Sequence, residues 1–374
     1  MAITIKEVQT KKDLKNFVLF PFTLYKNNKY WVPPLISDEL ETFDPDKNPA
    51  YEYCESKLWL AYKDDEIVGR IAGIINNKYI EIWKNKYARF GWVDFIDDIE
   101  VSKKLFEAFE NWARSKNLIG SHGPLGFTDM DHEGMLVEGF NELGTLATIY
   151  NYPYYPIHLE KLGYEKDVDW LEFQIKVPES IPDKALKVAN LVLERKGIRV
   201  LQVKKSKDLL PYAEELFHVL NQAFVNLYAF VPLTEKQIQL YVKKYFSFII
   251  PDYVKILLDK ENKVAGFVIG MPSLSLAMQK SKGKLFPFGF IHLLKALKKH
   301  KYLDLYLGAI RPDLQGKGAD ALLITELAKT AIEKGIISAE SNPELEENYK
   351  VQAHWKYFDA RQHKRRRCYK KLFD

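Results

Sequence analysis

Cysteine is scarce in this sequence of 374 residues, which contains only two. Two cysteines cannot supply the disulfide framework of a small secreted protein, so we expect the reducing environment of the cytoplasm. No apolar run is long enough to cross a bilayer, because the longest weakly polar stretch, residues 266–278, is short and contains a proline and two serines. The first residues also lack the layout of a signal peptide. These absences predict a cytoplasmic protein.

Motifs for metals and nucleic acids are lacking as well. There is no cluster of Cys and His, and no carboxylate and His spacing typical of a metal site, so we expect no metal. The basic runs are not interleaved with stacking aromatics, and no known reader module is recognisable. The sequence therefore gives no support for a nucleic-acid partner.

Charge is unevenly distributed although the net charge is only +5. Residues 118–160 contain no Lys or Arg, whereas residues 280–301 contain seven Lys and no acid. Residues 360–373 contain seven Lys and Arg, again without an acid. A solvated face explains any one run. Together, the runs indicate a cationic partner for the first half and an anionic partner for the second.

The two halves of the chain show the same order of predicted elements. In each half, two strands joined by a tight turn are followed by a strand, a helix, a strand, a short helix and a last strand. The first half has strands at 58–63, 66–75 and 90–95, a helix at 102–115 with Ser102 as N-cap, and a strand ending at Pro124. The second half has strands at 253–259, 263–270 and 303–310, a helix at 315–334 and a strand at 336–340.

This order predicts an α/β protein of two similar lobes, each with a mixed central sheet flanked by helices. A chain of this length also exceeds the size at which one core usually stops growing. We expect a first lobe at 1–177, a linking helix at 178–196 and a second lobe at 197–374.

A glycine-rich turn follows the strand at 303–310. Pro312 ends the strand, and the glycines at 316 and 318 open the long helix after it. Glycine lets backbone N–H groups approach a ligand, and the positive end of the new helix points to the same place. The residues of this predicted anion site are Gln315, Gly316, Lys317, Gly318 and Ala319.

The turn resembles motif A of the GCN5-related N-acetyltransferase (GNAT) superfamily, in which Gln or Arg, two residues, Gly, one residue and Gly or Ala follow one another. This resemblance implies that the turn binds the pyrophosphate of acyl-CoA or acetyl-CoA. It also implies that the pantetheine arm lies along Gly308, Ala309 and Ile310. Asp320 replaces the last small residue of the pattern, where it could crowd the pyrophosphate or point outward.

Other residues match the superfamily in part. Asn348 matches the Asn at the head of the last helix, whereas Trp355 stands where a Tyr acid often occurs. The first half keeps the later signature at residues 151–155 and 159–164, but its segment 96–102 is acidic and has no glycine. We therefore expect only the second lobe to bind CoA, which leaves the acceptor to the first.

A closer resemblance covers nearly the whole chain. Residues 31–35, 123–129, 133–140 and 365–369 resemble a bacterial family of tandem acetyltransferase-like proteins, which includes bacterial ceramide synthases. This implies N-acylation of an amine such as a sphingoid base, from acyl-CoA or from an acyl carrier protein. Two alternatives stay open, which are acetylation of a small polar amine and a non-catalytic protein that binds acyl-CoA or lipid.

Acyl transfer to an amine needs a base and donors for the oxyanion. No Ser-His-Asp or Cys-His arrangement is legible, which favours direct attack over an acyl-enzyme. Glu340 ends the strand that flanks the thioester and is a candidate base. Glu133, in an acid-rich loop, is a candidate to receive a proton or hold the ammonium. Asn151 and Tyr154 are candidates to line the acceptor cleft, with Tyr154 protonating the leaving thiolate.

The segment 285–301 predicts an amphipathic basic helix. Phe290, Leu294 and Leu297 share one face, and lysines follow on the other. Three interpretations stay open. The helix packs against its own lobe, it seats an acyl chain, or it rests on the anionic surface of the inner membrane.

Overall fold

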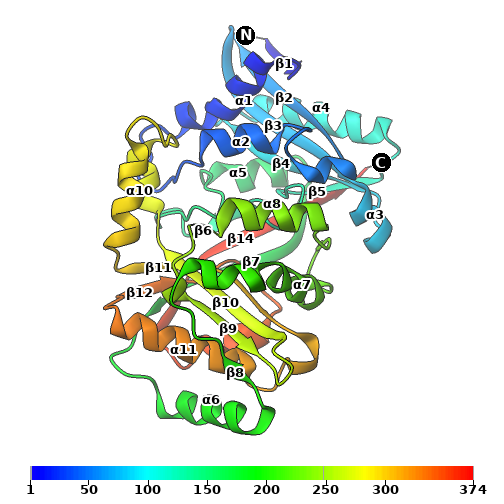
Figure 1. The fold of residues 1–374 in the computed structure, drawn as a ribbon. Coiled ribbons are helices and arrows are strands. Elements are labelled where there is room, and N and C mark those ends of the chain that lie inside the picture. Colours follow the sequence, from blue (N-terminus) through cyan, green and yellow to red (C-terminus); the bar gives the residue numbers. More distant parts are fainter. Residues whose placement is uncertain (1, 247, 374) are drawn as a thin grey trace. The chain divides into compact units, whose positions relative to one another are not determined.

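The computed structural model describes residues 2–246 and 248–373, which form two compact units (Figure 1). Unit 1 contains Met1–Trp170, Leu274–Leu294 and Lys364–Asp374, and unit 2 contains Leu171–Ser273 and Lys295–His363. This division follows contacts between residues, whereas the predicted lobe boundaries follow the order of repeated elements. Those boundaries stay a prediction.

Unit 1 contains a mixed sheet. Its strands, in spatial order, are β1 (Ile3–Glu7), β2 (Cys54–Lys63), β3 (Glu66–Asn76), β4 (Tyr87–Phe95), β5 (Gly120–Gly123) and the second part of β14 (Ala360–Leu372). Neighbouring strands are antiparallel except β4 and β5, which are parallel. A short strand, β6 (Met135–Glu138), also pairs with β14. The predicted tight turn between β2 and β3 is confirmed, with Asp64 and Asp65 both in the left-handed region.

Helix α4 (Ile99–Ser115) connects β4 to β5 and covers the sheet of unit 1. Its apolar face, with Leu105, Phe106 and Phe109 fully buried, packs in the main core of this unit. The predicted N-cap at Ser102 is wrong. Asp98 caps the helix by accepting a hydrogen bond from the N–H of Glu100 at 3.1 Å, so the helix begins three residues earlier than Ser102.

The remaining helices of unit 1 come from several parts of the chain, both before and after β2. They are α1 (Lys11–Leu24), α2 (Ile36–Thr42), η1 (Pro49–Glu52), α3 (Asn77–Trp83), α5 (Tyr154–Lys161), α9 (Ser275–Ser281) and the first part of α10 (Gly289–Lys298). The predicted helix over 285–301 is therefore shorter than expected. Helix α10 begins only at Gly289, because Pro287 interrupts the helical pattern before it.

The mixed sheet of unit 2 has the spatial order β7, β12, β11, β10, β9, β8, and only the part of β7 from Leu171 onward belongs to this unit. These strands are β7 (Glu165–Lys176), β12 (Ser338–Glu340), β11 (Tyr302–Ile310), β10 (Val264–Pro272), β9 (Val254–Leu258) and β8 (Arg199–Val200). Only β11 and β12 are parallel. A two-residue strand, β13 (Glu344–Leu345), pairs with β7.

The helices of unit 2 enclose two apolar clusters. They are α6 (Asp183–Lys196), η2 (Ser206–Tyr212), α7 (Ala213–Phe224), α8 (Glu235–Tyr245), η3 (Pro251–Tyr253), the second part of α10, η4 (Pro312–Leu314), α11 (Ala319–Glu333) and α12 (Tyr349–Trp355). In one cluster, Val192 of α6 and Leu322 of α11 pack against Leu257 of β9. In the other, Leu327 of α11 packs with Leu303 of β11.

The two sheets repeat one arrangement, which confirms the predicted fold class. In unit 1, β2, β3 and β4 are antiparallel neighbours, and α4 leads to the parallel strand β5. In unit 2, β9, β10 and β11 are antiparallel neighbours, and α11 leads to the parallel strand β12. Across the described part of the chain, no helix is both long enough and apolar enough to cross a membrane.

Candidate active site

The glycine-rich turn lies between β11 and α11 of unit 2. The helix begins at Ala319 and not at Gln315 as predicted, because residues 312–314 form a 3₁₀ turn and Gly318 has a left-handed backbone. Arg311 holds this connection in place through ion pairs with Asp259 at 2.8 Å and Asp313 at 2.7 Å. Gln315 donates to the Ile310 carbonyl at 3.1 Å, which closes the turn.

The two glycines of the turn have different roles. Both have positive φ, 68° at Gly316 and 87° at Gly318. A Cβ at Gly316 would meet nothing within 4 Å, whereas a Cβ at Gly318 would lie 2.9 Å from Val192 of α6. Gly318 thus lets α11 pack against α6, and Gly316 leaves the backbone open to a ligand. The first N–H groups of a helix have no partner within it, so this open turn suits an anion.

Asp320, which departs from the motif, is turned toward α12. Its Oδ2 lies 2.9 Å from Nε2 of His354, and its Oδ1 accepts a hydrogen bond from the N–H of Ala321 at 2.9 Å. Burial, the largest single influence, raises the pKa of Asp320, but the hydrogen bond and charge of His354 together with backbone N–H groups outweigh it, so the net pKa is lowered. The carboxylate is therefore committed to His354. Asn348 occupies the N-cap position of α12, as the resemblance implied. Lys317 donates to the Asp313 carbonyl at 2.6 Å.

The pairing between strands β11 and β12 ends several residues before this turn. They pair in register only from Tyr302 with Ser338 to Asp304 with Glu340. Strand β12 ends at Glu340, while β11 continues to Ile310. On the other side of β11, Gly308 pairs with Val268 of β10, and Gly308 is exposed. The edge of β11 that no longer faces β12 is where the resemblance places the pantetheine arm.

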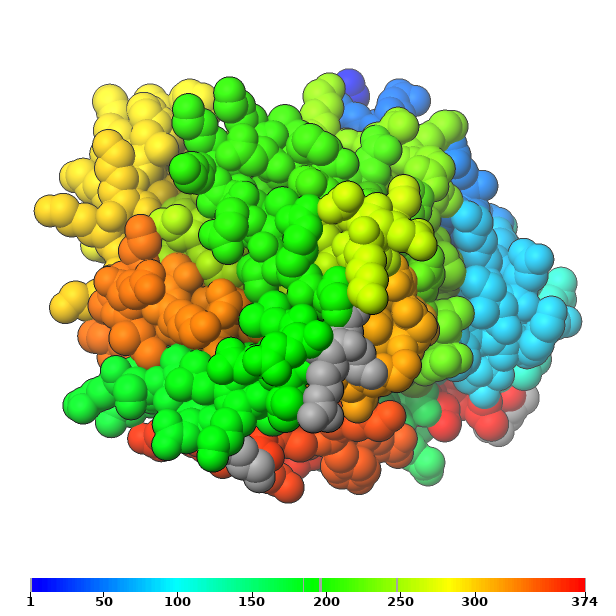
Figure 2. All heavy atoms as spheres, turned by 60° about the horizontal axis from the view of Figure 1, so that its bottom comes forward, coloured from blue at the N-terminus to red at the C-terminus, as the bar shows by residue number. Residues whose placement is uncertain are grey.

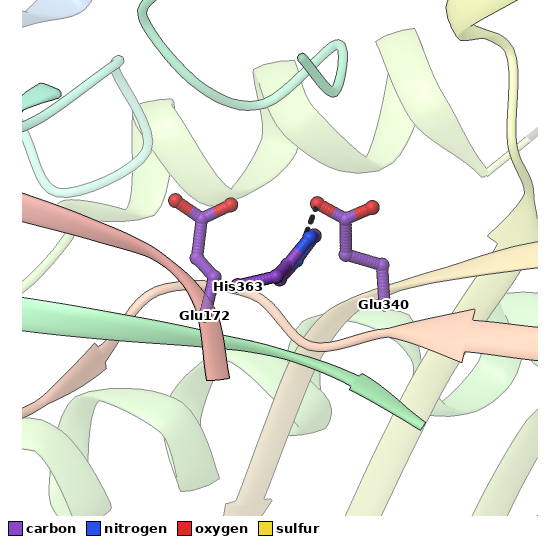
Figure 3. Close-up of side chains that lie close together, drawn as sticks. All are labelled: Glu172, Glu340 and His363. Atoms are coloured by element: carbon purple, nitrogen blue, oxygen red, sulfur yellow. Dashed lines mark ion pairs between the residues drawn. The ribbon is translucent and has the colours of Figure 1, made fainter. Parts of the chain in front are cut away.

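Glu340 stands at the end of β12 beside two other titratable side chains. His363 of β14 brings its Nε2 to 3.3 Å from Oε1 of Glu340. Glu172 of β7 completes a trio in which one ligand-type atom of each residue lies within 4.8 Å of the others. Figure 3 shows both carboxylates on the same side of their strands, with the imidazole between them. Glu172 is fully buried, His363 nearly so, and Glu340 half-buried.

This trio allows two kinds of chemistry. A carboxylate held beside an imidazole can accept a proton from a substrate, and the imidazole can share that proton. Two carboxylates and one imidazole are also donor types that bind a divalent cation such as Zn²⁺. Glu172 and His363 are therefore the residues of unit 2 that could hold a metal together with Glu340.

A tyrosine of β11 faces the same region. Asp304 pairs in register with Glu340, and Tyr306 follows two residues later on the same face. The Tyr306 hydroxyl is buried, and the described residues offer it no hydrogen-bond partner. Burial raises its pKa well above the usual value, and the nearby charges of Asp304, Tyr245 and Glu340 add to this. Tyr306 therefore keeps its proton at neutral pH and can donate it to a bound ligand.

Unit 1 contains a separate cavity of about 70 Å³. Charged side chains in its wall are Glu39, Arg70 and Asp94, and most of the remainder is aromatic or aliphatic. The aromatic lining residues are Tyr25, Trp31, Trp92, Tyr150 and Tyr155. A cavity with aromatic walls and carboxylates is the kind of site that binds an organic cation.

The charged groups of this cavity are tightly held. Asp94 accepts hydrogen bonds from Arg70 at 2.7 Å and from the Tyr25 hydroxyl at 2.8 Å. Glu39 accepts one from the indole N–H of Trp92 at 2.7 Å. Burial raises the pKa of Glu39, although Arg70 opposes the shift. Trp92 has a φ of 42°, a strained backbone for a bulky residue, and such strain tends to cluster at binding sites.

The predicted acceptor residues all fall in unit 1. Asn151 lines the cavity, but its amide is bonded on both sides to the backbone of Leu136, at 2.7 and 3.0 Å. Tyr154 does not line it, and its hydroxyl donates to the Phe95 carbonyl at 2.6 Å. Glu340 lies in unit 2. The catalytic roles of Asn151 and Tyr154 stay predictions.

Glu133 belongs to a group of carboxylates near the buried Arg89 of unit 1. Burial raises the pKa of Asp129 to about 7 and that of Asp131 to about 6. The pKa of Glu133 is raised well above its usual value, first by burial and then by the charge of Asp129. These surroundings favour the protonated form of Glu133. Its role toward the acceptor stays a prediction.

Sequence reasoning missed Glu172, His363 and Tyr306. Glu172 and His363 join Glu340 only through the pairing of strands that are far apart in the chain, so no local pattern marks them. Tyr306 did carry a signal, since it alternates with Asp304 on the strand before the glycine turn.

Solved structures with a similar fold include a tandem GNAT protein and a further GCN5-related N-acetyltransferase. The tandem GNAT protein from the clavulanic acid biosynthesis pathway superposes with a TM-score of 0.55 at 10% identity, covering 99% of this chain and 98% of that one. A GCN5-related N-acetyltransferase from Sphaerobacter thermophilus gives a TM-score of 0.51 at 10% identity, with 99% and 95% covered. The chain therefore has the tandem GNAT fold.

Two curated relatives resemble the chain in sequence, while no family model matches it. Protein YghO of Escherichia coli (strain K12) is 28% identical over 374 residues, which cover 98% of this chain and 95% of that protein. The bacterial ceramide synthase of Caulobacter vibrioides (strain NA1000 / CB15N) is 27% identical over 300 residues, or 79% and 77%. The predicted resemblance to bacterial ceramide synthases is thus confirmed.

The raised pKa of Asp129 predicts a pH-dependent stability effect. A carboxyl whose pKa is about 7 when folded binds its proton more tightly than in the unfolded chain, where the pKa is about 3.9. The free energy of unfolding therefore falls as the pH rises between these values. Asp129→Asn removes this loss of stability, and we expect its Tm to exceed the wild-type Tm by a few °C at about pH 8 and by less at about pH 5.

Glu66→Gln, at an exposed carboxylate, is the control and should show no such trend in thermal unfolding. A gain for Asp129→Asn that is equal at both pH values would contradict the account.

Proposed function

We propose that this protein is an acyltransferase that moves an acyl group from CoA to an amine, with a hydrophobic amine such as a sphingoid base as the acceptor. The observation that carries the proposal is the position of Glu340. It pairs with His363 at the point where β11 and β12 part, on the strand that follows the glycine-turn helix. The likeness to a bacterial ceramide synthase supports the choice of acceptor.

Unit 2 is the proposed donor site. The pyrophosphate would bind at Gln315, Gly316, Lys317, Gly318 and Ala319, where the open backbone of Gly316 and the start of α11 offer N–H groups. The pantetheine arm would follow the edge of β11 at residues 308–310, and Asn348 would lie at the head of α12. An acyl carrier protein presents its thioester on the same arm, so it could replace CoA as the donor.

Glu340 is the proposed base. The neutral amine attacks the thioester carbonyl, a C–N bond forms, and Glu340 receives the proton that the amine loses. A backbone N–H of β11 stabilises the oxyanion. The C–S bond then breaks, and the proton held by Glu340 and His363 passes to the leaving thiolate. Tyr306 keeps its proton and donates a hydrogen bond to the sulfur or the oxyanion.

Unit 1 supplies the proposed recognition site for the acceptor. Its cavity of about 70 Å³ suits a cationic head group better than a whole lipid. Trp31 and Trp92 offer aromatic faces to a cation, and Glu39 offers a carboxylate. Asn151 shapes the wall of this cavity through its bonds to Leu136, while Glu133 and Tyr154 stay candidates for proton transfer.

Donor binding is tested by a pair of substitutions at Gly316. Asp and Asn both tolerate a left-handed backbone and differ mainly in charge. Gly316→Asp places a carboxylate next to the pyrophosphate, and we expect it to weaken CoA binding about tenfold or more. Gly316→Asn is the control, with a change of at most about threefold. Isothermal titration calorimetry with CoA measures both. Equal affinities for the two variants would show that the turn does not contact phosphate.

The base is tested by Glu340→Gln. With palmitoyl-CoA and sphinganine, we expect kcat to fall by about 10² to 10⁴ while CoA affinity stays unchanged, because the substitution removes only the proton acceptor. His363→Gln should cause a smaller loss, and Glu347→Gln, at an exposed acid, should cause none. A full rate for Glu340→Gln would remove Glu340 from the mechanism.

A chelator distinguishes general-base catalysis from metal binding at Glu172, Glu340 and His363. EDTA should leave the wild-type rate unchanged if Glu340 acts as the base. A rate that EDTA abolishes and Zn²⁺ restores would assign Glu172, Glu340 and His363 to a metal instead.

A further inference from the structure

The segment from Lys280 to Lys298 presents an unusual apolar surface. Phe286 and Phe288 are 77% and 71% exposed, and Phe290, Ile291 and Leu294 are exposed as well. No residue of α10 is buried. The rings of Phe286 and Phe290 lie together, with their centroids 5.8 Å apart. We call these five residues the apolar tip. Figure 2 shows the atoms of this segment in yellow at the molecular surface.

Lysines surround the apolar tip without any acid. Lys280, Lys282 and Lys284 precede it, Lys295 and Lys298 follow it on α10, and all five are exposed. Residues 280–301 contain no Asp or Glu. The segment thus joins large apolar side chains to positive charge, and both features complement an apolar surface with negative charge at its border.

The base of the segment is firmly attached to unit 1. Gln279 donates to the carbonyls of Lys29 and Trp31, both at 2.9 Å, and the Gly283 carbonyl accepts from the N–H of Ile36 at 3.0 Å. Met278 and Ser281 are buried. The apolar tip is therefore exposed on a fixed support and is not part of a loose loop.

We propose that the apolar tip and its lysines dock the protein on an anionic lipid bilayer. Apolar side chains with lysines beside them are the composition of helices that lie in a membrane interface, where the charges meet anionic head groups. Protein interfaces are different, because lysine is depleted in their cores. This inference does not depend on the acyltransferase chemistry proposed for unit 2.

The apolar tip is attached to the part of unit 1 that also lines the proposed acceptor cavity. Gln279 and Gly283 form hydrogen bonds to residues 29–36. This stretch includes Trp31, Val32 and Pro34, which line the cavity of unit 1. The proposed acceptor site and the docking segment thus share one support. A lipid amine could reach that cavity from the bilayer without crossing water.

Vesicle flotation tests the proposal with the full-length protein. We expect the protein to float with vesicles in which about a third of the lipid is phosphatidylglycerol, and to bind phosphatidylcholine vesicles at least about tenfold more weakly. Added salt should reduce the binding, since the attraction to the head groups is screened. No binding to either vesicle, or equal binding to both, would overturn the proposal.

Matched variants locate the docking surface. Phe286→Ser with Phe288→Ser should weaken binding to the anionic vesicles about tenfold or more, and so should Lys284→Gln with Lys295→Gln. Leu210→Ser with Val225→Ser removes exposed apolar side chains elsewhere and should leave binding unchanged. All variants should keep the wild-type Tm, because the altered side chains are exposed. If the Phe variant floats as the wild type does, or if its only effect is to dissociate a dimer in size-exclusion chromatography, the apolar tip is not a membrane surface.

Discussion

The early end of the pairing between β11 and β12 is the constraint on which the rest of unit 2 depends. Pairing in register ends at Asp304 and Glu340, and β11 then continues without a described strand partner on that side, where the Tyr306 carbonyl accepts a hydrogen bond from the Asn342 side chain at 2.9 Å. The separation exposes backbone along the expected path of a pantetheine arm, and it places the carboxylate of Glu340 at the branch point. Because β12 is so short, β7 and β14 can bring Glu172 and His363 against the same carboxylate. The strand edge proposed for the pantetheine arm and the position of the proposed base therefore both follow from one feature of the sheet.

The corresponding helix of unit 1, α4, has a different N-terminus. Asp98 caps α4, accepting from the N–H of Glu100 and pairing with Lys63 at 2.9 Å, so a carboxylate already occupies the positive end of that helix. In unit 2, the N-cap residue of α11 is Gly318, which has no side chain to cap the helix, and the carboxylate of Asp320 in the first turn bonds the N–H of Ala321 and faces His354. This difference is the physical basis for expecting phosphate at the turn of unit 2 and not at the acidic, glycine-free segment of unit 1. Unit 1 instead surrounds its cavity with the Asp94 and Arg70 pair and with aromatic rings.

Much of the fold could be predicted, because its signals are local. The turn at Asp64 and Asp65, the alternating strands and the glycines before α11 each depend on neighbouring residues. The helix starts were less predictable, since Ser102 and Gln315 are both plausible first residues until Asp98 and Gly318 are seen in place. The trio of Glu172, Glu340 and His363 in the candidate site could not be predicted beyond Glu340. Its members lie on three strands whose pairing joins residues 172, 340 and 363, and one Glu or His in a strand carries no local signal.

The central claim is that this chain joins an acyl group to an amine. The most direct test incubates the purified protein with palmitoyl-CoA and sphinganine, follows free CoA thiol with a thiol reagent, and quantifies the amide by mass spectrometry. The account predicts one thiol released for each N-acyl product, and no thiol release without the amine. Thiol release that occurs equally without the amine would indicate a hydrolase. Tight CoA binding with no product from any hydrophobic or small polar amine would indicate a binding protein, and either result would contradict the account.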